Sequence, residues 1–168
     1  LDGNDTISIF GTSRNEEAAF DENFVYFFDS TFNFRNLSFE NIYAYGSGGN
    51  DDSYMMASDG DDRFYGNETY SYLRGDSNAY FNYVKNFDSL IVDGSSGLGF
   101  DRAYIYDGAG DEIYDAESSQ VTLLYDSTGT FGPVIAAKGF DETSIYAVNG
   151  GNDVATLHGS DGNDKFTA

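Results

Sequence analysis

The sequence predicts an all-β protein, a parallel β-helix or β-solenoid built from repeats of roughly fifty residues. Three observations lead to this prediction. Aromatic residues make up 17% of a chain with a net charge of −21, and a disordered acidic tail would be poor in aromatic residues. The chain has 20 Gly and a single Pro among many Asn, Asp and Ser residues, a composition typical of short strands joined by tight turns. The third observation is an internal repeat.

The repeat is visible as stretches that align without gaps over residues 51–66, 101–116 and 153–168, and residues 1–9 match the second half of a further copy. We expect one repeat array over residues 1–168. Because the chain opens on Leu1 and not on Met, we interpret it as part of a longer protein. The copies are expected at about 1–50, 51–100 and 101–152, with 153–168 starting the next.

Apolar residues in the aligned columns mark short strands. Met55, Ile105 and Leu157 share one column, Phe64 and Tyr114 share another, and we expect both columns to face the core. Gly/Asp turns separate these strands, since Gly adopts positive φ without steric cost. Residues 16–20 are interpreted as an insertion loop. Other expected strands are 6–10, 24–28, 42–45, 70–73, 79–84, 90–92, 120–125, 134–137 and 144–148.

About five strands therefore fall in each copy. In a solenoid, a period near fifty residues would form two coils of about 25 residues each, stacked on one another around a continuous core. Five strands do not divide evenly between two coils. Tandem β-sandwich-like modules are therefore the alternative architecture.

The composition also limits the partners. The chain has 8 Lys and Arg residues, spread singly, against 29 Asp and Glu residues, so nucleic acid or an anionic membrane would be repelled. No apolar run approaches the roughly 20 residues that span a bilayer. With no Cys, the chain can form neither disulfides nor thiolate zinc sites. We expect no nucleic-acid partner and no membrane insertion.

The segment 150–167 resembles a known repeat family. Its residues 159–167, GSDGNDKFT, fit the nonapeptide Gly-Gly-x-Gly-x-Asp-x-hydrophobic-x except for Ser160, and 48–51 and 58–64 match in part. This pattern is similar to that of hemolysin-type (RTX-like) calcium-binding secreted bacterial proteins. The fifty-residue copies look like those of very large tandem-repeat bacterial surface proteins. The resemblance implies a parallel β-roll, calcium between adjacent turns and a secreted or cell-surface location.

Calcium is the candidate cofactor, because hard cations take six to eight oxygen ligands and the Gly/Asp turns offer carboxylates and carbonyls. Successive turns are eleven residues apart, as from Asp51 to Asp62, and not nine, so the family's ligand set does not carry over directly. The alternative is that these acids cap their own turns. In a solenoid, Asp5, Asp62, Glu112 and Asp164 would align along one edge, and Asp51, Asp101 and Asp153 along another. The candidate metal ligands are Asp51, Asp59, Asp62, Asp111, Asp153, Asp161 and Asp164.

Catalysis is not predicted. The single histidine, His158, has Met56 and Tyr106 as its repeat equivalents, so we expect a surface or packing role. Acids that recur with the repeat are interpreted as architectural, and Arg and Lys residues are too scattered to assist a carboxylate cluster.

The predicted function is that of an extracellular structural segment of a filament, surface layer or matrix protein. Its partners would be neighbouring copies of itself or adjoining repeats of a longer chain, assembled end to end. The alternative is a calcium-dependent adhesin module that binds carbohydrate. Pairs such as Tyr43 and Tyr45, or Tyr104 and Tyr106, alternate along strands, so some rings must face outward, where they could stack on sugars. A polysaccharide-degrading enzyme is the least favoured class.

Overall fold

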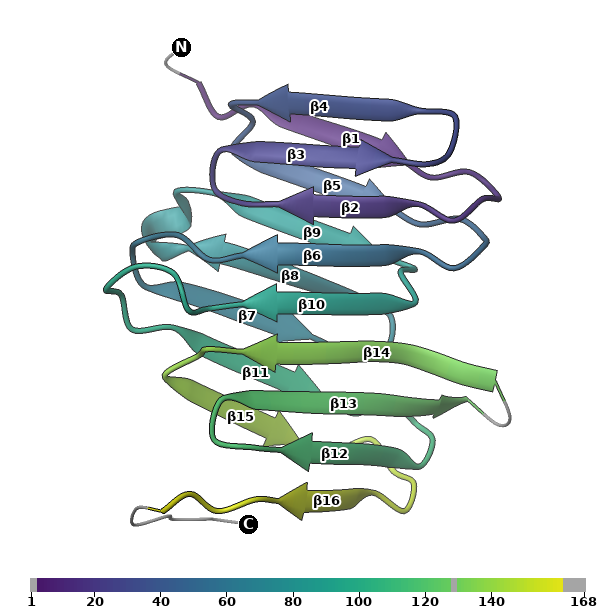
Figure 1. Ribbon diagram of the computed structural model, residues 1–168, viewed down its shortest axis with the longest axis vertical. Coiled ribbons are helices and arrows are strands. Elements are labelled where there is room, and N and C mark those ends of the chain that lie inside the picture. The colour runs from purple at the N-terminus through teal and green to yellow at the C-terminus, as the bar shows by residue number, and fades with distance from the viewer. Residues whose placement is uncertain (1–2, 128–129, 162–168) are drawn as a thin grey trace.

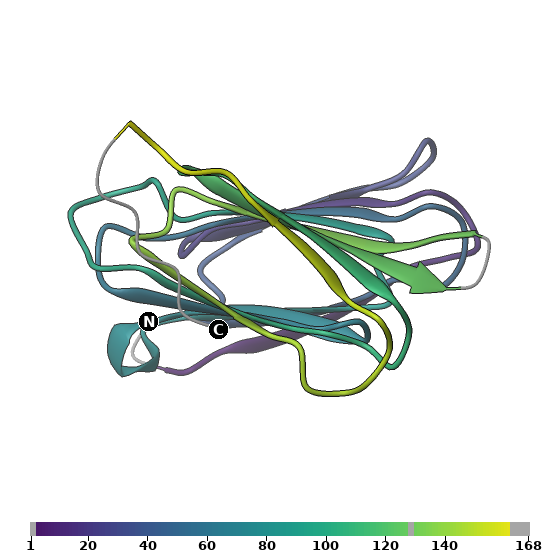
Figure 2. The same ribbon diagram turned by 90° about the horizontal axis from the view of Figure 1, so that it is seen from below.

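The computed structural model describes residues 3–127 and 130–161, which form two β-sheets packed face to face (Figures 1 and 2). Within these residues the only helical element is the short 3-10 turn η1 (Asp76–Asn78). The predicted all-β class is therefore confirmed. No helix in the described part of the chain is long and apolar enough to cross a membrane.

Seven strands form sheet A and nine form sheet B. In spatial order, sheet A contains β1 (Thr6–Phe10), β5 (Asn41–Tyr45), β9 (Phe81–Lys85), β8 (Tyr70–Gly75), β7 (Asp62–Gly66), β11 (Arg102–Tyr106) and β15 (Glu142–Tyr146). Sheet B contains β16 (Val154–Leu157), β12 (Glu112–Ala116), β13 (Gln120–Ser127), β14 (Thr130–Lys138), β10 (Ser89–Asp93), β6 (Asp52–Met56), β2 (Glu17–Phe20), β3 (Phe24–Phe28) and β4 (Asn33–Leu37).

The chain alternates between the sheets and doubles back once in each repeat. Three antiparallel meanders, β2–β3–β4, β7–β8–β9 and β12–β13–β14, each lie within one sheet. All other neighbouring strands are parallel. A simple parallel β-helix is therefore not confirmed, because the meanders interrupt the parallel stacking. The sequence did not predict them.

Strands that are five apart along the chain lie in opposite sheets. β1, β6, β11 and β16 lie in sheets A, B, A and B, and the strands that open the meanders, β2, β7 and β12, lie in B, A and B. β1 precedes a meander as β6 does, so its segment belongs to the first half of a copy, and the predicted match of residues 1–9 to the second half is wrong. An odd number of strands in each copy makes the next copy begin on the other face. This explains how five strands fit a two-sheet structure without dividing into two coils.

Alternating burial forms the core between the sheets. Met55 and Ile105 are both 0% exposed, and Phe64 and Tyr114 are also buried, so these predicted core positions are confirmed. Leu157 shares the column of Met55 but is 45% exposed, because β16 is the last strand of sheet B.

One short strand contradicts its sequence interpretation. Residues 16–20 were expected to form an insertion loop, but Glu17–Phe20 is β2. Ala18 and Phe20 are buried in the core, whereas Glu17 faces solvent. Because the segment begins with Glu16 and Glu17, the alternation of Ala18 and Phe20 was too short to indicate a strand from the sequence.

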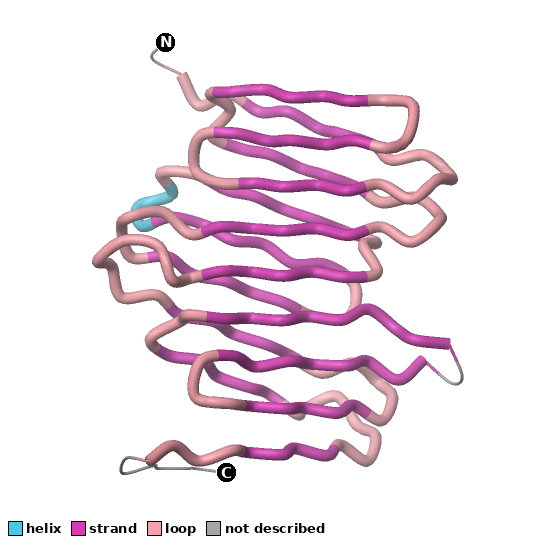
Figure 3. Tube along the Cα trace, in the orientation of Figure 1, coloured by secondary structure: helices cyan, strands magenta, loops and turns pink. Residues whose placement is uncertain are grey.

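The turns stack closely along both edges of the molecule (Figure 3). Gly49 and Gly151 have φ of +106° and +94°, which L side chains rarely adopt. A Cβ on Gly49 would overlap the carbonyl of Arg14, and one on Gly151 would overlap that of Gly110, each in the preceding turn of the stack. These glycines are required both by the backbone conformation and by the close approach of the turns.

We predict that Ile105→Ala destabilises the protein by about 2–5 kcal/mol, the usual cost of removing a fully buried aliphatic side chain. Leu157→Ala at the equivalent position should cost less than about 1 kcal/mol, because that side chain is half exposed. Urea unfolding of both variants measures the difference, and equal losses would contradict the assigned burial.

Candidate functional site

Acidic residues stand at the start of most parallel strands. Apart from the middle strand of each meander (β3, β8 and β13), the strands of sheet B, in front in Figure 1, begin on one edge of the molecule and those of sheet A, behind it, on the other. The edge where sheet B strands begin has Glu16, Asp51, Asp88, Glu112 and Asp153, and the opposite edge has Asp5, Glu40, Asp62, Asp101 and Asp141.

Six of these residues form three equivalent acid pairs. The pairs lie where β2 meets β6, where β7 meets β11 and where β12 meets β16, all parallel contacts. In each pair, the backbone N–H of the first residue donates to the carboxylate of the second. The distances are 2.9 Å from Glu16 to Asp51, 2.8 Å from Asp62 to Asp101 and 3.1 Å from Glu112 to Asp153.

The acids also close their own turns. The amide of Thr12 donates to Glu16 at 3.0 Å, and the amide of Ser58 donates to Asp62 at 2.7 Å, four residues away in both cases. Asp51 accepts in the same way from the Ser47 amide at 3.2 Å. Most of the recurrent carboxylates are therefore occupied by backbone donors, which supports the alternative that they are turn architecture.

Burial raises the pKa of several of these carboxyl groups. The pKa of Asp51 rises to about 6, mainly through burial, with the nearby charge of Glu16 contributing in the same direction. Burial also raises the pKa of Asp101 to about 6; the Asp62 amide that donates to this carboxylate lowers it, and the negative charge of Asp62 raises it. The pKa of Glu112 rises to about 7, first through burial and then through Asp153. All three shifts favour the protonated form in the folded protein.

The structure separates most of the candidate metal ligands. Asp51 and Asp153 lie on one edge and Asp62 on the other, because successive copies alternate between the sheets. The expected alignments of Asp62 with Glu112 and of Asp51 with Asp101 are therefore wrong. Three candidates, Asp59, Asp111 and Asp161, are exposed, and Asp164 lies outside the described residues.

Three carboxylates converge at one place on the sheet B edge. Asp107, Glu112 and Asp153 each have an oxygen within 4.8 Å of the others, the one such group among the described residues. Asp107 and Glu112 are buried, and Glu112 Oε2 has no hydrogen-bond partner. The buried hydroxyl of Tyr114, two residues along β12, also has none. We call these three carboxylates the acidic cluster.

Of the acidic cluster, only Asp153 was a predicted ligand. Asp107 was missed because its equivalents at the start of the corresponding turns are Gly11 and Ala57, so it does not recur. The replacement of Gly11 and Ala57 by an acid at position 107 was the one feature of the sequence that could have indicated this ligand.

A second candidate surface is the outer face of sheet A. A row of aromatic rings crosses all seven strands, with neighbouring centroids 4.5–6.0 Å apart. The tyrosines of this row are half-buried and Phe10 is 71% exposed, so the prediction of outward-facing Tyr rings is confirmed. The row, here called the tyrosine face, consists of Phe10, Tyr45, Tyr83, Tyr70, Tyr65, Tyr106 and Tyr146.

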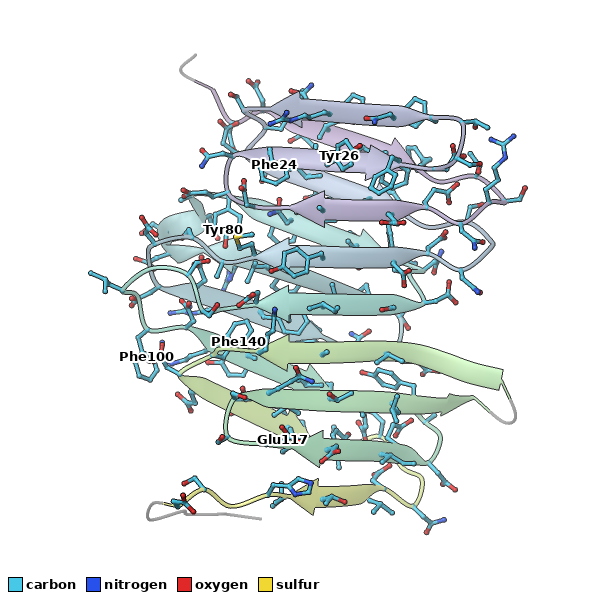
Figure 4. The ribbon with its side chains drawn as sticks, viewed as in Figure 1. Phe24, Tyr26, Tyr80, Phe100, Glu117 and Phe140 are labelled. Atoms are coloured by element: carbon cyan, nitrogen blue, oxygen red, sulfur yellow. The ribbon has the colours of Figure 1, made fainter. Side chains whose placement is uncertain are left out.

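The outer face of sheet B differs. Its aromatic residues gather near one end, where Phe24 and Tyr26 of β3 lie (Figure 4). His158 follows β16, and its Nε2 lies 2.9 Å from Asp115 Oδ1, with both side chains half exposed. The histidine therefore contacts a neighbouring strand at the surface.

Comparison with known proteins identifies no relative: no family model, no curated protein and no solved structure matches the chain.

The shifted carboxyl groups predict that stability falls as the pH rises from about 4 to about 6. In that window the folded protein holds protons on Asp51 and Asp101 that the unfolded chain, with pKa near 3.8, has lost. In Asp101→Asn the free energy of unfolding should fall by roughly 1–3 kcal/mol less over this pH range than in the unmodified protein. Denaturant unfolding at several pH values measures the difference. Asp59→Asn, in an exposed turn, is the matched control. If the free energy of unfolding of Asp101→Asn falls with pH as steeply as that of the unmodified protein, Asp101 does not hold the proton.

Proposed function

We propose that this chain is a structural segment of a continuing β-array, in which further copies of the fifty-residue unit extend both sheets. The array would be a solenoid with antiparallel meanders, secreted or at the cell surface, in a filament, surface layer or matrix. The location rests on the resemblance of the Gly/Asp turns to those of secreted repeat proteins. The observation that carries the structural proposal is that the core is open at its two ends.

The open ends are seen by comparing equivalent positions. Met55 and Ile105 are completely buried, whereas Leu157 of β16 is 45% exposed and Ile9 of β1 is half-buried. Both sheets also end in strands with one unpaired side, β1 and β4 at one end and β15 and β16 at the other (Figure 1). Unpaired edges and exposed apolar side chains favour addition of a further layer.

The strand equivalences indicate which layer fits. β9 pairs with β5, and β14 pairs with β10, so a strand equivalent to β4 would pair with β15. β16 already occupies the position of β1 in the next copy. Separate chains joined head to tail would bring β16 and β1 together and add a surplus strand to one sheet. The geometry therefore favours a continuous chain of repeats over a polymer of separate chains.

A fusion in phase tests this proposal. Joining residue 153 to residue 6 of a second copy merges β16 with β1, and we expect its melting temperature to exceed that of the single chain, because each added interface stabilises its neighbours. In such a fusion Ile9 of the second copy takes the place of Leu157 and becomes buried, so Ile9→Ala there should cost about 2–5 kcal/mol. Calorimetry and urea unfolding provide the measurements.

The matched control joins residue 161 to residue 3 through a flexible Gly/Ser linker, which keeps β16 and β1 as separate strands. It should melt at the temperature of the single chain. The proposal fails if the in-phase fusion melts no higher than this control.

The tyrosine face favours a second candidate function, carbohydrate binding. Half-exposed rings in a row across a sheet offer flat apolar surfaces on which sugar rings can stack. A shallow depression beside the row is lined by Tyr65, Tyr70 and Tyr106 together with Glu68 and Asn149, which add hydrogen-bonding groups. This candidate corresponds to an adhesin module.

For the adhesin function, Tyr106→Ala should weaken retention in polysaccharide affinity gels by about tenfold, since truncating an aromatic anchor typically costs more than about 1 kcal/mol. Tyr26→Ala, on the outer face of sheet B, is the control and should leave retention unchanged. If neither the unmodified chain nor the control is retained by any of a panel of neutral and acidic polysaccharides, carbohydrate binding is excluded for that panel.

A further inference from the structure

The three acid pairs share one backbone arrangement but differ in the groups around them. In the second pair, the Tyr80 hydroxyl donates to Asp62 Oδ1 at 2.8 Å. The Ser58 amide and hydroxyl donate to Asp62 Oδ2 at 2.7 and 2.9 Å. Both oxygens of this buried carboxylate therefore have donors, and the second pair serves as an internal reference. Tyr80 is labelled in Figure 4.

The third pair lacks the corresponding phenol. The Tyr80 ring lies against Gly75, where a Cβ would be 2.8 Å from the ring. Gly75 pairs with Asp62, and the residue that pairs with Glu112 is Tyr125. The Tyr125 hydroxyl donates to the carbonyl of Tyr106 at 2.5 Å and not to the Glu112 carboxylate. Glu112 Oε2 is buried without a donor, as Glu16 Oε2 is in the first pair. Among the described residues, only the third pair has a further carboxylate within reach, that of Asp107.

The third pair also gains oxygen atoms. Asp107 stands where the second copy has Ala57, and Tyr114 stands where it has Phe64. Both side chains are buried, and the Tyr114 hydroxyl has no partner. Burial raises the pKa of Tyr114, and the negative charges of Asp107, Asp153 and Glu112 raise it further.

The position of Asp107 is fixed from the neighbouring turn. The Asn149 amide donates to Asp107 Oδ2 at 2.8 Å, and Asn149 Nδ2 donates to Asp107 Oδ1 at 2.9 Å. A third carboxylate is thus held beside a pair that already has an unpartnered oxygen. Buried carboxylates in one place repel one another, and such charges are normally paired or coordinate a metal ion.

We propose that the acidic cluster binds a hard divalent cation of the Ca²⁺ class through the carboxylates of Asp107, Glu112 and Asp153. All the available ligand atoms are oxygens, which these cations prefer. The ligands come from two stacked turns, the one between β11 and β12 and the one between β15 and β16. The bound ion would hold β16 against β12 and thereby stabilise the last layer of sheet B. This inference does not depend on the array proposal.

The experiment measures Tb³⁺ luminescence and thermal unfolding of the full chain. Tb³⁺ replaces Ca²⁺ and is sensitised by nearby tyrosine, so emission on tyrosine excitation should appear and be displaced by Ca²⁺. The melting temperature should rise with millimolar Ca²⁺ and fall back with chelator, because the ion binds the folded state. Asp107→Asn and Glu112→Gln should each lose the Ca²⁺-dependent rise and the saturable emission.

Glu117→Gln is the matched control, since it removes a carboxylate from the far end of the same hairpin, where Glu117 is exposed (Figure 4). It should keep both signals. Two results would overturn the proposal: emission that persists in Asp107→Asn and Glu112→Gln, which assigns the ion to other acids, or a melting temperature insensitive to Ca²⁺ but raised by Glu112→Gln, which means that Glu112 and Asp153 share only a proton.

Discussion

The odd number of strands in each repeat constrains the rest of this structure. A chain that passes between two sheets and places five strands in each copy must start the next copy in the opposite sheet, as β1, β6, β11 and β16 do. Each meander fills the gap left when the chain moves ahead by three strand positions. Sequence positions that are equivalent therefore lie on opposite edges in successive copies, and residues from different columns become neighbours.

The acid pairs follow directly from this arrangement. Parallel strands that begin at one edge bring their first peptide N–H groups beside the first carboxylate of the next strand, and the amide of Asp62 thus reaches Asp101. A carboxylate can hold this place because it also accepts the amide of its own turn, as Asp62 does from Ser58. The cost is burial of negative charge, seen in the raised pKa of Asp51 and Asp101. Part of the chain's excess of Asp and Glu therefore serves to accept backbone hydrogen bonds in the stacked turns.

The two faces of sheet A have different roles. Inward residues such as Ala44 and Ile105 make the core, while Tyr45 and Tyr106, next to them in the chain, stack across the outer face. Stacked rings cover the backbone of neighbouring strands and bury part of one another's surface, which stabilises a sheet that is otherwise open to solvent on that side. The same half-exposure leaves ring faces available to a ligand.

The sequence by itself determined the all-β class, most of the strands and the core columns, because the two-residue period that buries Met55 and Ile105 is a local property of each strand. It missed β4 (Asn33–Leu37) and β2, where Ala18 and Phe20 give only two alternating core positions after two acids. Which acids meet was decided by the tertiary structure alone. Glu112 and Asp153 are 41 residues apart and become neighbours only through the parallel contact of β12 with β16. Asp107 joins them because the turn before β12 stacks on the turn before β16, and no spacing within a single copy encodes that contact.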